Sequence, residues 1–349
     1  LKGMRNMSKW YEDEKCSEGI IISSRVRLAR NVKKYNFSLK LTENDAVKMI
    51  DELSEAINSL DIVKDYSSYN FKTLDEYQKQ AMKERHVISN FLLGQKQAAG
   101  FVSKDEDISI MLNEEDHIRI QAYAPGMDME KAFELADKVD DAIDSVTDYA
   151  FDEKYGYLTT CPSNVGTGMR ASYMLHLPAL AGNNRISGLA SEVGRFGLVL
   201  RSVYGDGSKN YGDIYKLSNQ ITLGVSEKEI IDSLTHIANQ IISQERTLRK
   251  QYVLNKRLSA SDIAYRSYGV LRYARKLSLN DAMLLLSQIR LGLAQGLIGT
   301  DMENEFCVYQ LMIGVMPANL ALMNDSDMSP EEIEEYRAKF IRDNLPVIR

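Results

Sequence analysis

The chain has 349 residues, enough for about two domains with a substantial core. Its 44% hydrophobic and 26% charged residues are close to the average for globular proteins, which excludes a disordered or fibrous chain. A net charge of -6 without a long Lys or Arg run argues against a direct nucleic-acid or anionic-membrane binder.

The cysteines, histidines and apolar runs set further limits. The three cysteines lie far apart and the four histidines lack metal-ligand spacing, so neither a protein metal site nor a disulfide framework is predicted. This cysteine usage favours a cytoplasmic protein. No apolar run reaches the roughly 18 residues of a membrane span, and we expect no membrane partner.

The first predicted element is a strand over 20–30. Its alternation puts Arg25 and Arg27 on one face and Val26 and Leu28 on the other. Two cations therefore project side by side from this strand.

The next elements are a helix and a hairpin. A capping box at 42–45 predicts a helix that continues to residue 57. Alternating residues at 108–112 and 118–120 predict two strand segments around the carboxylate-rich bend 113–116.

Two more strands precede a change of period. Residues 197–204 predict an apolar strand that carries Arg201 and leads into the glycine-flanked loop 205–208. Period two then resumes over 213–223.

The rest of the chain is predicted to be helical. A capping box at 226–229 begins a long helix, and further helices are predicted from 278 and from Pro330. We infer an α+β domain over 1–254 and an all-α C-terminal domain over 255–349. The apolar segments 282–293 and 311–316 of the second domain are expected to permit homodimerisation.

Five arginines lie in strand or loop contexts beside polar or glycine-rich sequence: Arg25, Arg27, Arg119, Arg170 and Arg201. Taken singly, each is compatible with a surface or ion-pair role. As a converging set they would bind the phosphates of a nucleotide bidentately. The chain has no GxxxxGK[ST] phosphate-binding motif, so nucleotide binding would require another phosphate-binding arrangement, such as this set of arginines.

Three polar segments are further candidates, each with a structural alternative. Cys161 precedes a glycine-bearing loop, although a free cysteine is usually a small buried hydrophobe. Residues 114–116 supply carboxylates or form a solvated hairpin tip, and 205–207 supply Asp206 or form a plain turn. The residues alone therefore indicate an anion-binding enzyme with paired carboxylates and a candidate thiol.

In combination and in order, four motifs resemble the phosphagen (guanidino) kinase family: Ser23–Arg30, Asn113–Arg119, Cys161–Arg170 and Arg201–Ser208. Three more stretches resemble the bacterial protein-arginine kinases of that family: Tyr157–Cys161, Ser218–Gly224 and Tyr265–Val270. The resemblance covers nearly the whole chain. It implies a mainly antiparallel sheet flanked by helices and a helical C-terminal domain that mediates dimerisation or partner binding.

The resemblance also implies roles for individual residues. The five arginines would hold the phosphates of ATP, with Mg²⁺ bound mainly through the phosphates. Glu115 and Asp206 would bind and orient the acceptor guanidinium, with Cys161 nearby. Ser24, His86 and Met174 are the residues expected at the nucleotide pocket.

Two departures from the family pattern affect these expectations. Asp206 stands where Glu is usual, and Ser202 stands where glycine is usual. The stretch 333–338 keeps only Arg337 and Ala338 of a C-terminal phosphoarginine-binding motif, so no allosteric phosphoarginine site is assigned.

The expected function is phosphorylation of arginine within proteins. In creatine and arginine kinases the first motif follows a helical N-terminal domain, whereas Ser23 lies near the start of this sequence, so we expect an open site that accepts a protein surface. Alternatives are a small-molecule guanidino kinase and a pseudokinase scaffold. The resemblance implies as partners a heat-shock repressor as substrate, a zinc-finger activator and a Clp unfoldase, with Clp-dependent degradation of the marked proteins.

Overall fold

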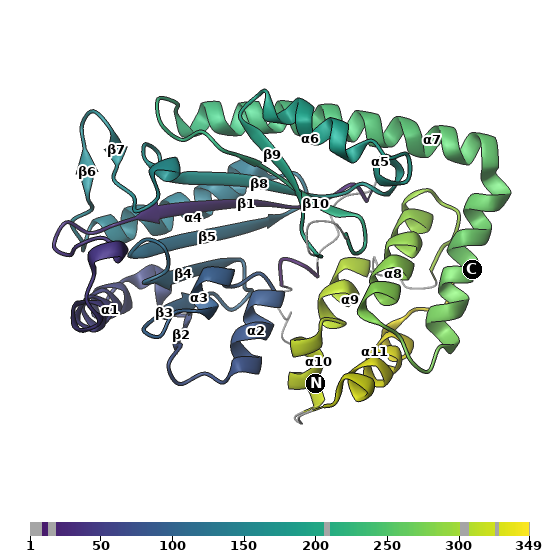
Figure 1. Cartoon of the computed structure of the whole chain (residues 1–349), viewed down its shortest axis with the longest axis horizontal. Coiled ribbons are helices and arrows are strands. Elements are labelled where there is room, and N and C mark those ends of the chain that lie inside the picture. The colour runs from purple at the N-terminus through teal and green to yellow at the C-terminus, as the bar shows by residue number, and fades with distance from the viewer. Residues whose placement is uncertain (1–8, 13–18, 206–209, 301–306, 325–327, 349) are drawn as a thin grey trace.

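The computed structural model describes residues 9–12, 19–205, 210–300, 307–324 and 328–348. Within these residues, eight strands form one antiparallel sheet in the order β2-β3-β4-β5-β1-β8-β10-β9 (Figure 1). The strands are β1 (Ile21–Arg30), β2 (Ser67–Asn70), β3 (Ala99–Val102), β4 (Ile108–Leu112), β5 (Ile118–Pro125), β8 (Met169–His176), β9 (Leu198–Ser202) and β10 (Ile214–Asn219). A separate small hairpin pairs β6 (Phe151–Asp152) with β7 (Gly156–Tyr157).

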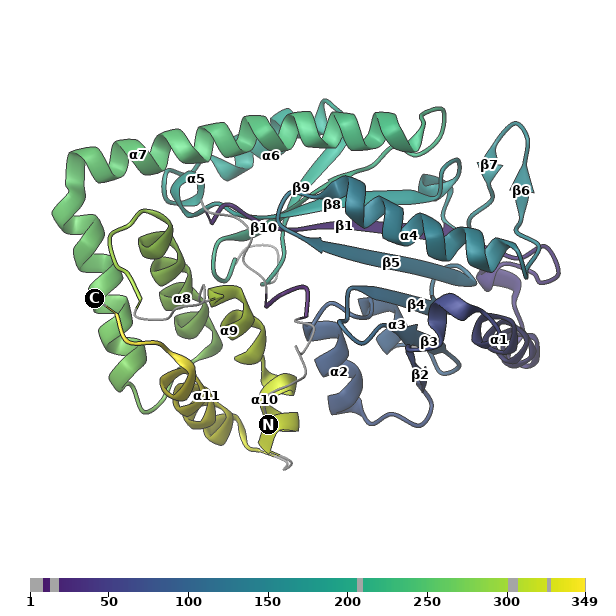
Figure 2. The same cartoon turned by 180° about the vertical axis from the view of Figure 1, so that it is seen from behind.

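One face of the sheet is covered by helices. Helix α4 (Met129–Asp144) crosses β1 and β5, and the first half of α7 (Glu227–Tyr273) lies over β8 and β10 (Figure 2). The alternation in β1 explains this layer, because Val26 and Leu28 point into the main core and are at most 1% exposed. The opposite face carries Arg25 and Arg27 on β1, whereas on β4 the same face carries Met111, which packs in a separate apolar core with Met82 and Leu92.

Shorter helices complete the α+β part and border the sheet. They are α1 (Glu43–Asn58), α2 (Glu76–Glu84), α3 (Asn90–Leu93), α5 (Pro178–Gly182) and α6 (Ile186–Gly194), with single 3₁₀ turns at Ser38–Lys40, Asp61–Val63 and Pro162–Asn164. The buried residues of α1, such as Met49 and Leu53, join the same core as α4.

The C-terminal part is helical and packs against one end of the sheet. Its helices are the end of α7, then α8 (Leu279–Ala294), α9 (Val308–Gly314), α10 (Pro317–Asn324) and α11 (Pro330–Asn344). A second core joins these helices to sheet residues such as Tyr123 and Met174. Helix α7 passes from one part to the other and departs from helical geometry at Lys256. Among the described residues, no helix is long and apolar enough to cross a membrane.

The predicted class, an α+β part followed by helices, is confirmed. The Ser226 and Ser329 capping boxes both form, and the predicted hairpin of β4 and β5 brackets the carboxylate bend. The strand predicted to reach residue 223 ends instead at Asn219. There the Asn219 side chain binds the backbone oxygens of Met169 and Ile221, so the chain turns away from the sheet.

The apolar segments 282–293 and 311–316 contribute largely to the folding of the chain itself. Met283, Leu286 and Met312 are buried within the second core, whereas Leu284 is 43% exposed. That these segments permit homodimerisation stays a prediction.

The contact between α2 and α10 generates a stability prediction. Glu84, which is 3% exposed, accepts hydrogen bonds from the backbone nitrogens of Ala318 at 3.0 Å and Asn319 at 2.9 Å. We expect Glu84→Ala to lower the free energy of unfolding by about 1–3 kcal/mol, because two buried N–H groups lose their acceptor. Urea denaturation of the full chain measures this loss.

Glu76, at the exposed start of the same helix, provides the matched control. Glu76→Ala should change the free energy of unfolding by less than about 0.5 kcal/mol. Equal losses in the two variants would show that Glu84 does not stabilise the contact between the two parts.

Candidate active site

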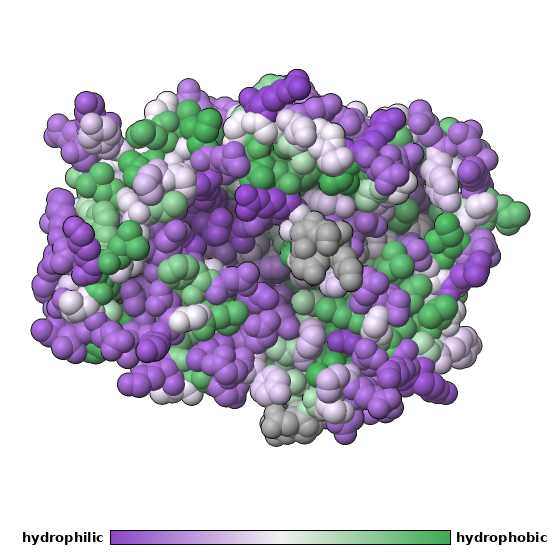
Figure 3. All heavy atoms as spheres, viewed as in Figure 1, coloured by the Kyte–Doolittle hydropathy of each residue, from purple (hydrophilic) through white to green (hydrophobic). Residues whose placement is uncertain are grey.

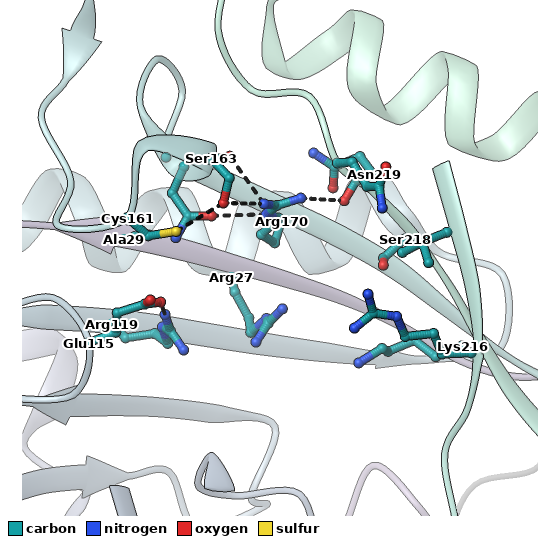
Figure 4. Close-up of a pocket in the computed structure, with 15 residues that line it drawn as sticks. Arg27, Ala29, Glu115, Arg119, Cys161, Ser163, Arg170, Lys216, Ser218 and Asn219 are labelled. Carbon is teal, nitrogen blue, oxygen red and sulfur yellow. Dashed lines mark hydrogen bonds and ion pairs between the residues drawn. The ribbon is translucent and has the colours of Figure 1, made fainter. Parts of the chain in front are cut away.

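The polar face of the sheet carries a cluster of cations. Arg25 and Arg27 project from β1, Arg119 from β5, Arg170 from β8 and Arg201 from β9. The antiparallel register brings them together, since Arg27 is directly opposite Arg170. The five arginines predicted from the sequence thus line one continuous region, and Figure 4 shows Arg27, Arg119 and Arg170 within it.

Two adjoining cavities contain this cluster, one of about 520 Å³ and one of about 560 Å³. The first is lined by Glu115, Cys161 and Arg170, and the second by His86 and Tyr204. We name them the acceptor cavity and the nucleoside cavity after the groups that the family resemblance leads us to expect there. Figure 3 shows a hollow lined by hydrophilic residues in the middle of this face.

The cluster contains more positive charge than its own carboxylates neutralise. Arg27 Nε and Arg25 Nη2 are buried and have no hydrogen-bond partner among the described residues. Burial, followed by the charges of Arg25 and Arg119, lowers the pKa of Arg27 well below its ordinary value. Buried donors without acceptors are costly, so this arrangement is suited to an anion with several oxygens.

The carboxylate bend forms an ion-pair network. Glu114 Oε1 lies 2.6 Å from Arg119 Nη1, and Glu115 Oε2 lies 3.2 Å from Arg119 Nη2. Glu114 is fully buried and also accepts from Ser89 Oγ and the backbone nitrogen of Glu115. Glu115 is partly exposed at the acceptor cavity, so its carboxylate remains accessible to a ligand.

Arg170 fixes the loop that carries Cys161. Its guanidinium donates to Asn164 Oδ1 at 2.9 Å, to the Asn219 oxygen at 2.7 Å and to Ser163 Oγ at 3.0 Å. Cys161 Sγ lies 3.1 Å from the same Ser163 hydroxyl and is partly exposed. The arginine therefore positions the thiol beside the acceptor cavity.

Two glycines allow this loop to approach the sheet. Gly166 has a φ of +110°, and a Cβ there would lie 2.2 Å from the oxygen of Thr222. Gly168 has a φ of +65°, and its Cβ would lie 2.6 Å from the oxygen of Ala29. Both positions need glycine because the left-handed backbone and the close contact exclude a side chain.

The residues expected at the nucleotide pocket do not all lie on the same face of the sheet. His86 and Met174 line the nucleoside cavity, but Ser24 does not. Ser24 Oγ is buried on the opposite face, where it donates to the Gly126 oxygen at 2.8 Å. Its neighbour Ser23 lines the cavity instead, and Ser23 Oγ is buried without a partner among the described residues.

The nucleoside cavity is closed partly by the helical part. Leu279 at the start of α8 and Met316 after α9 line it together with His86. His86 Nε2 also lies 3.0 Å from the hydroxyls of both Tyr204 and Tyr309. Burial, and then the charges of Arg25 and two lysines, lower the pKa of His86 to about 3, so its ring is neutral near pH 7.

Two residues missed by sequence reasoning belong to the site. Lys216 on β10 lines both cavities, and it reaches them through the pairing of β10 with β9, which puts Lys216 opposite Arg201. Glu114 was recognised only as part of a carboxylate-rich bend. Its position beside Glu115 gives no sign that it is the buried partner of Arg119.

Two expectations fall elsewhere. Asp206 lies outside the described residues, so its placement relative to Glu115 stays a prediction. Arg337, which remains from the phosphoarginine-binding motif, is 2% exposed and donates to the backbone oxygens of Val315 and Leu277. This arginine joins elements of the helical part.

Comparison with known proteins places this geometry in a family. A profile described as ATP:guanido phosphotransferase, C-terminal catalytic domain, matches residues 48–248, and one described as Protein-arginine kinase McsB C-terminal domain matches 256–349. A protein-arginine kinase of Caldanaerobacter subterraneus subsp. tengcongensis is 40% identical over 93% of this chain and 97% of its own length. The chain belongs to the protein-arginine kinase family.

Other relatives agree with this membership. The protein-arginine kinase of Brevibacillus brevis is 38% identical over 98% of this chain and 96% of its own length. The solved duplicated taurocyamine kinase from Schistosoma mansoni, with 22% identity and a TM-score of 0.60, shares the fold over 70% of this chain and 36% of its own. The resemblance to the bacterial protein-arginine kinases is confirmed.

The Arg119 network of this protein-arginine kinase generates a second stability prediction. Glu114→Ala should lower the free energy of unfolding by about 3–5 kcal/mol, because it leaves the nearly buried Arg119 without its close partner. Urea denaturation measures the loss.

Glu115→Ala is the matched control, since it removes the more exposed carboxylate bound to the same arginine and should cost about 1 kcal/mol or less. Similar losses would mean that Glu114 has no special structural role.

Proposed function

We propose that this chain transfers the γ-phosphoryl group of ATP to the guanidino group of arginine residues in proteins. The observation that supports this most is the convergence of five arginines beside an accessible carboxylate, where two of the arginines have buried donors without a partner among the described residues. The curated relatives are protein-arginine kinases, and this chain matches them over nearly their whole length.

The arginines supply the charge that the transition state requires. During transfer, negative charge spreads over the phosphoryl oxygens, and fixed cations stabilise it without needing to reorganise. Arg25 and Arg27 have donors free for phosphate oxygens, whereas Arg170 uses several of its donors on the loop. We therefore assign Arg25 and Arg27 to direct phosphate binding and Arg170 to both binding and loop placement.

Magnesium is proposed to bind mainly through phosphate oxygens. Mg²⁺ prefers oxygen ligands and commonly combines substrate phosphates with few protein carboxylates. Among the described residues, the carboxylates of Glu114 and Glu115 lie at the cluster, and both are paired with Arg119. We therefore assign them to the ion-pair network with Arg119 and not to metal binding.

Glu115 is proposed to orient the acceptor, together with Asp206. A guanidinium has a pKa above 12, so freeing a nitrogen lone pair near neutral pH costs at least about 6 kcal/mol. Alignment can supply roughly 7–11 kcal/mol, which exceeds the typical contribution of a general base. As the N–P bond forms and the P–O bond to ADP breaks, the guanidinium proton leaves toward the carboxylate or water.

The nucleoside cavity is proposed to hold the adenosine end of ATP. Met174, Leu279 and Met316 offer apolar surface, and neutral His86 offers a planar ring. The two cavities share Arg27 and Arg119, so a phosphate chain can extend from one cavity into the other.

The substrate class can be tested directly. A protein chain provides remote contacts that help to position the guanidine, so free arginine should lose turnover as well as apparent affinity. The enzyme would be incubated with Mg-ATP and either free arginine or an arginine-rich unfolded protein. The product to detect is an acid-labile, alkali-stable phosphate on nitrogen. Equal or better kcat/KM with free arginine would replace this proposal with a small-molecule guanidino kinase.

A single substitution tests the role of Glu115. Glu115→Gln should reduce phosphoryl transfer by at least about 100-fold while it leaves ATP affinity nearly unchanged, because the arginines remain and guanidine orientation is lost. Single-turnover transfer and equilibrium ATP binding measure the two effects separately. Near-normal transfer in this variant would show that Glu115 has no part in the mechanism. If the protein without the substitution binds ATP but transfers no phosphoryl group, a pseudokinase scaffold would be favoured.

Further proposals rest on the family resemblance. They are a cytoplasmic location, a homodimer, a zinc-finger activator, a heat-shock repressor among the substrates, and Clp-dependent degradation of the marked proteins. We also propose a domain boundary near residue 254 and a role for Cys161 as a substrate contact.

Cys161→Ala should slow the reaction without stopping it, since the thiol is proposed to contact the acceptor without forming a covalent intermediate.

A further inference from the structure

Lys216 occupies the junction between the two cavities. It is one of four residues that line both, with Arg27, Glu115 and Arg119. In β10 it lies opposite Arg201 of β9 and opposite Met174 of β8. Figure 4 shows its side chain extending from β10 toward Arg27. An elongated ligand that occupies both cavities must pass this ammonium group.

We propose that Lys216 is a further phosphate ligand of the nucleotide, and that the bound phosphates control whether its amine carries a proton. This inference rests on the proposed function, because it requires a polyphosphate in the arginine cluster. It adds to that function a sixth cation that differs in kind from the five arginines.

The surroundings of Lys216 supply cations without a compensating acid. Among the described residues it forms no ion pair, and its strongest influences come from β1 and β9. The charge of Arg25, then burial and the charges of Arg27 and Arg201, lower the pKa of Lys216 to about 7. A guanidinium keeps its proton in this range even where burial and neighbouring cations lower its pKa, as they do for Arg27, whereas a lysine can release its proton.

The other charged and titratable groups around the two cavities do not supply the missing charge. Glu114 and Glu115 are paired with Arg119, and neutral His86 lies in the segment between α2 and α3. The remaining titratable groups that line the cavities are Lys83, Glu84, Tyr123, Cys161, Arg170, Tyr204 and Tyr211. The Glu84 carboxylate already accepts hydrogen bonds from two backbone nitrogens of α10, and Arg170 adds a further cation.

The direction of the pH effect follows from these charges. Without nucleotide, the amine loses its proton as the pH rises through about 7. Bound phosphate oxygens favour the ammonium form, so nucleotide binding above pH 7 takes up a proton. ATP affinity should therefore weaken as the pH rises from 7 to 9, by up to about tenfold per pH unit.

The experiment compares the full chain with three variants. Lys216→Met removes the charge, Lys216→Arg keeps a charge that does not titrate in this range, and Lys33→Met removes an exposed lysine paired with Asp148 as a control. Binding of Mg-ATP is measured by calorimetry between pH 6.5 and 9 in buffers of different ionisation enthalpy. This design gives the affinity and the number of protons taken up.

The expected results separate charge from proton exchange. Lys216→Met should weaken binding by about 10- to 100-fold near pH 7, which is the value of one hydrogen bond to a charged group. Lys216→Arg should retain affinity within about fivefold but lose the extra proton uptake and the associated pH dependence. Lys33→Met should behave like the unchanged protein.

Each contrary outcome is distinct. Unchanged affinity in Lys216→Met would show that Lys216 is not a phosphate ligand. If Lys216→Met does not fold, equal proton uptake in Lys216→Arg and the unchanged protein would still refute the inference. Absence of Mg-ATP binding by the unchanged protein would overturn the proposed function, and this inference with it.

Discussion

Repulsion between like charges on one face of the sheet is the constraint that the rest of the site depends on. Arg25, Arg27 and Arg170 lie on adjacent strands, where the register holds them close whether or not an anion is present. Within the five-arginine cluster, only Arg119 has close carboxylate partners among the residues that the structure describes. The remaining repulsion is opposed by the apolar core on the other face of the same strands, which is formed independently of any ligand.

Several polar contacts keep that charged face in place. Arg30, at the end of β1, forms a buried ion pair with Asp140 of α4 at 2.6 Å and stacks over the ring of Tyr157. Its Nη1 also donates to the Thr167 oxygen, beside the glycine that lets the Cys161 loop approach the strand. Burial raises the pKa of Asp140 even though Arg30 acts in the opposite direction. Through these Arg30 contacts, the strand that presents Arg25 and Arg27 is held against both the helical layer and the loop.

Local pattern predicted the parts of this site that depend on local geometry. Alternation in 20–30 put Arg25 and Arg27 on one face, and the capping boxes located the helix starts. The same alternation puts Ser23 on the face of Arg25 and Arg27 and Ser24 on the other, whereas the family resemblance led us to expect Ser24 at the pocket. Lys216 was missed for a different reason: its importance comes from Arg201 and Met174 across two strands, and pairing between distant segments is not encoded in either segment alone.

The wall that the helical part contributes to the nucleoside cavity has a consequence for modularity. Leu279 and Met316 follow α7 in the chain, yet they face the same space as His86 and Met174 of the sheet part. A shift of α8 or α9 relative to the sheet would change the shape of that space without altering any arginine. A catalytic fragment that ended within α7 would retain the cationic cluster but lack one side of its pocket. Exchange of helical parts between relatives would thus also exchange part of the nucleoside contact surface.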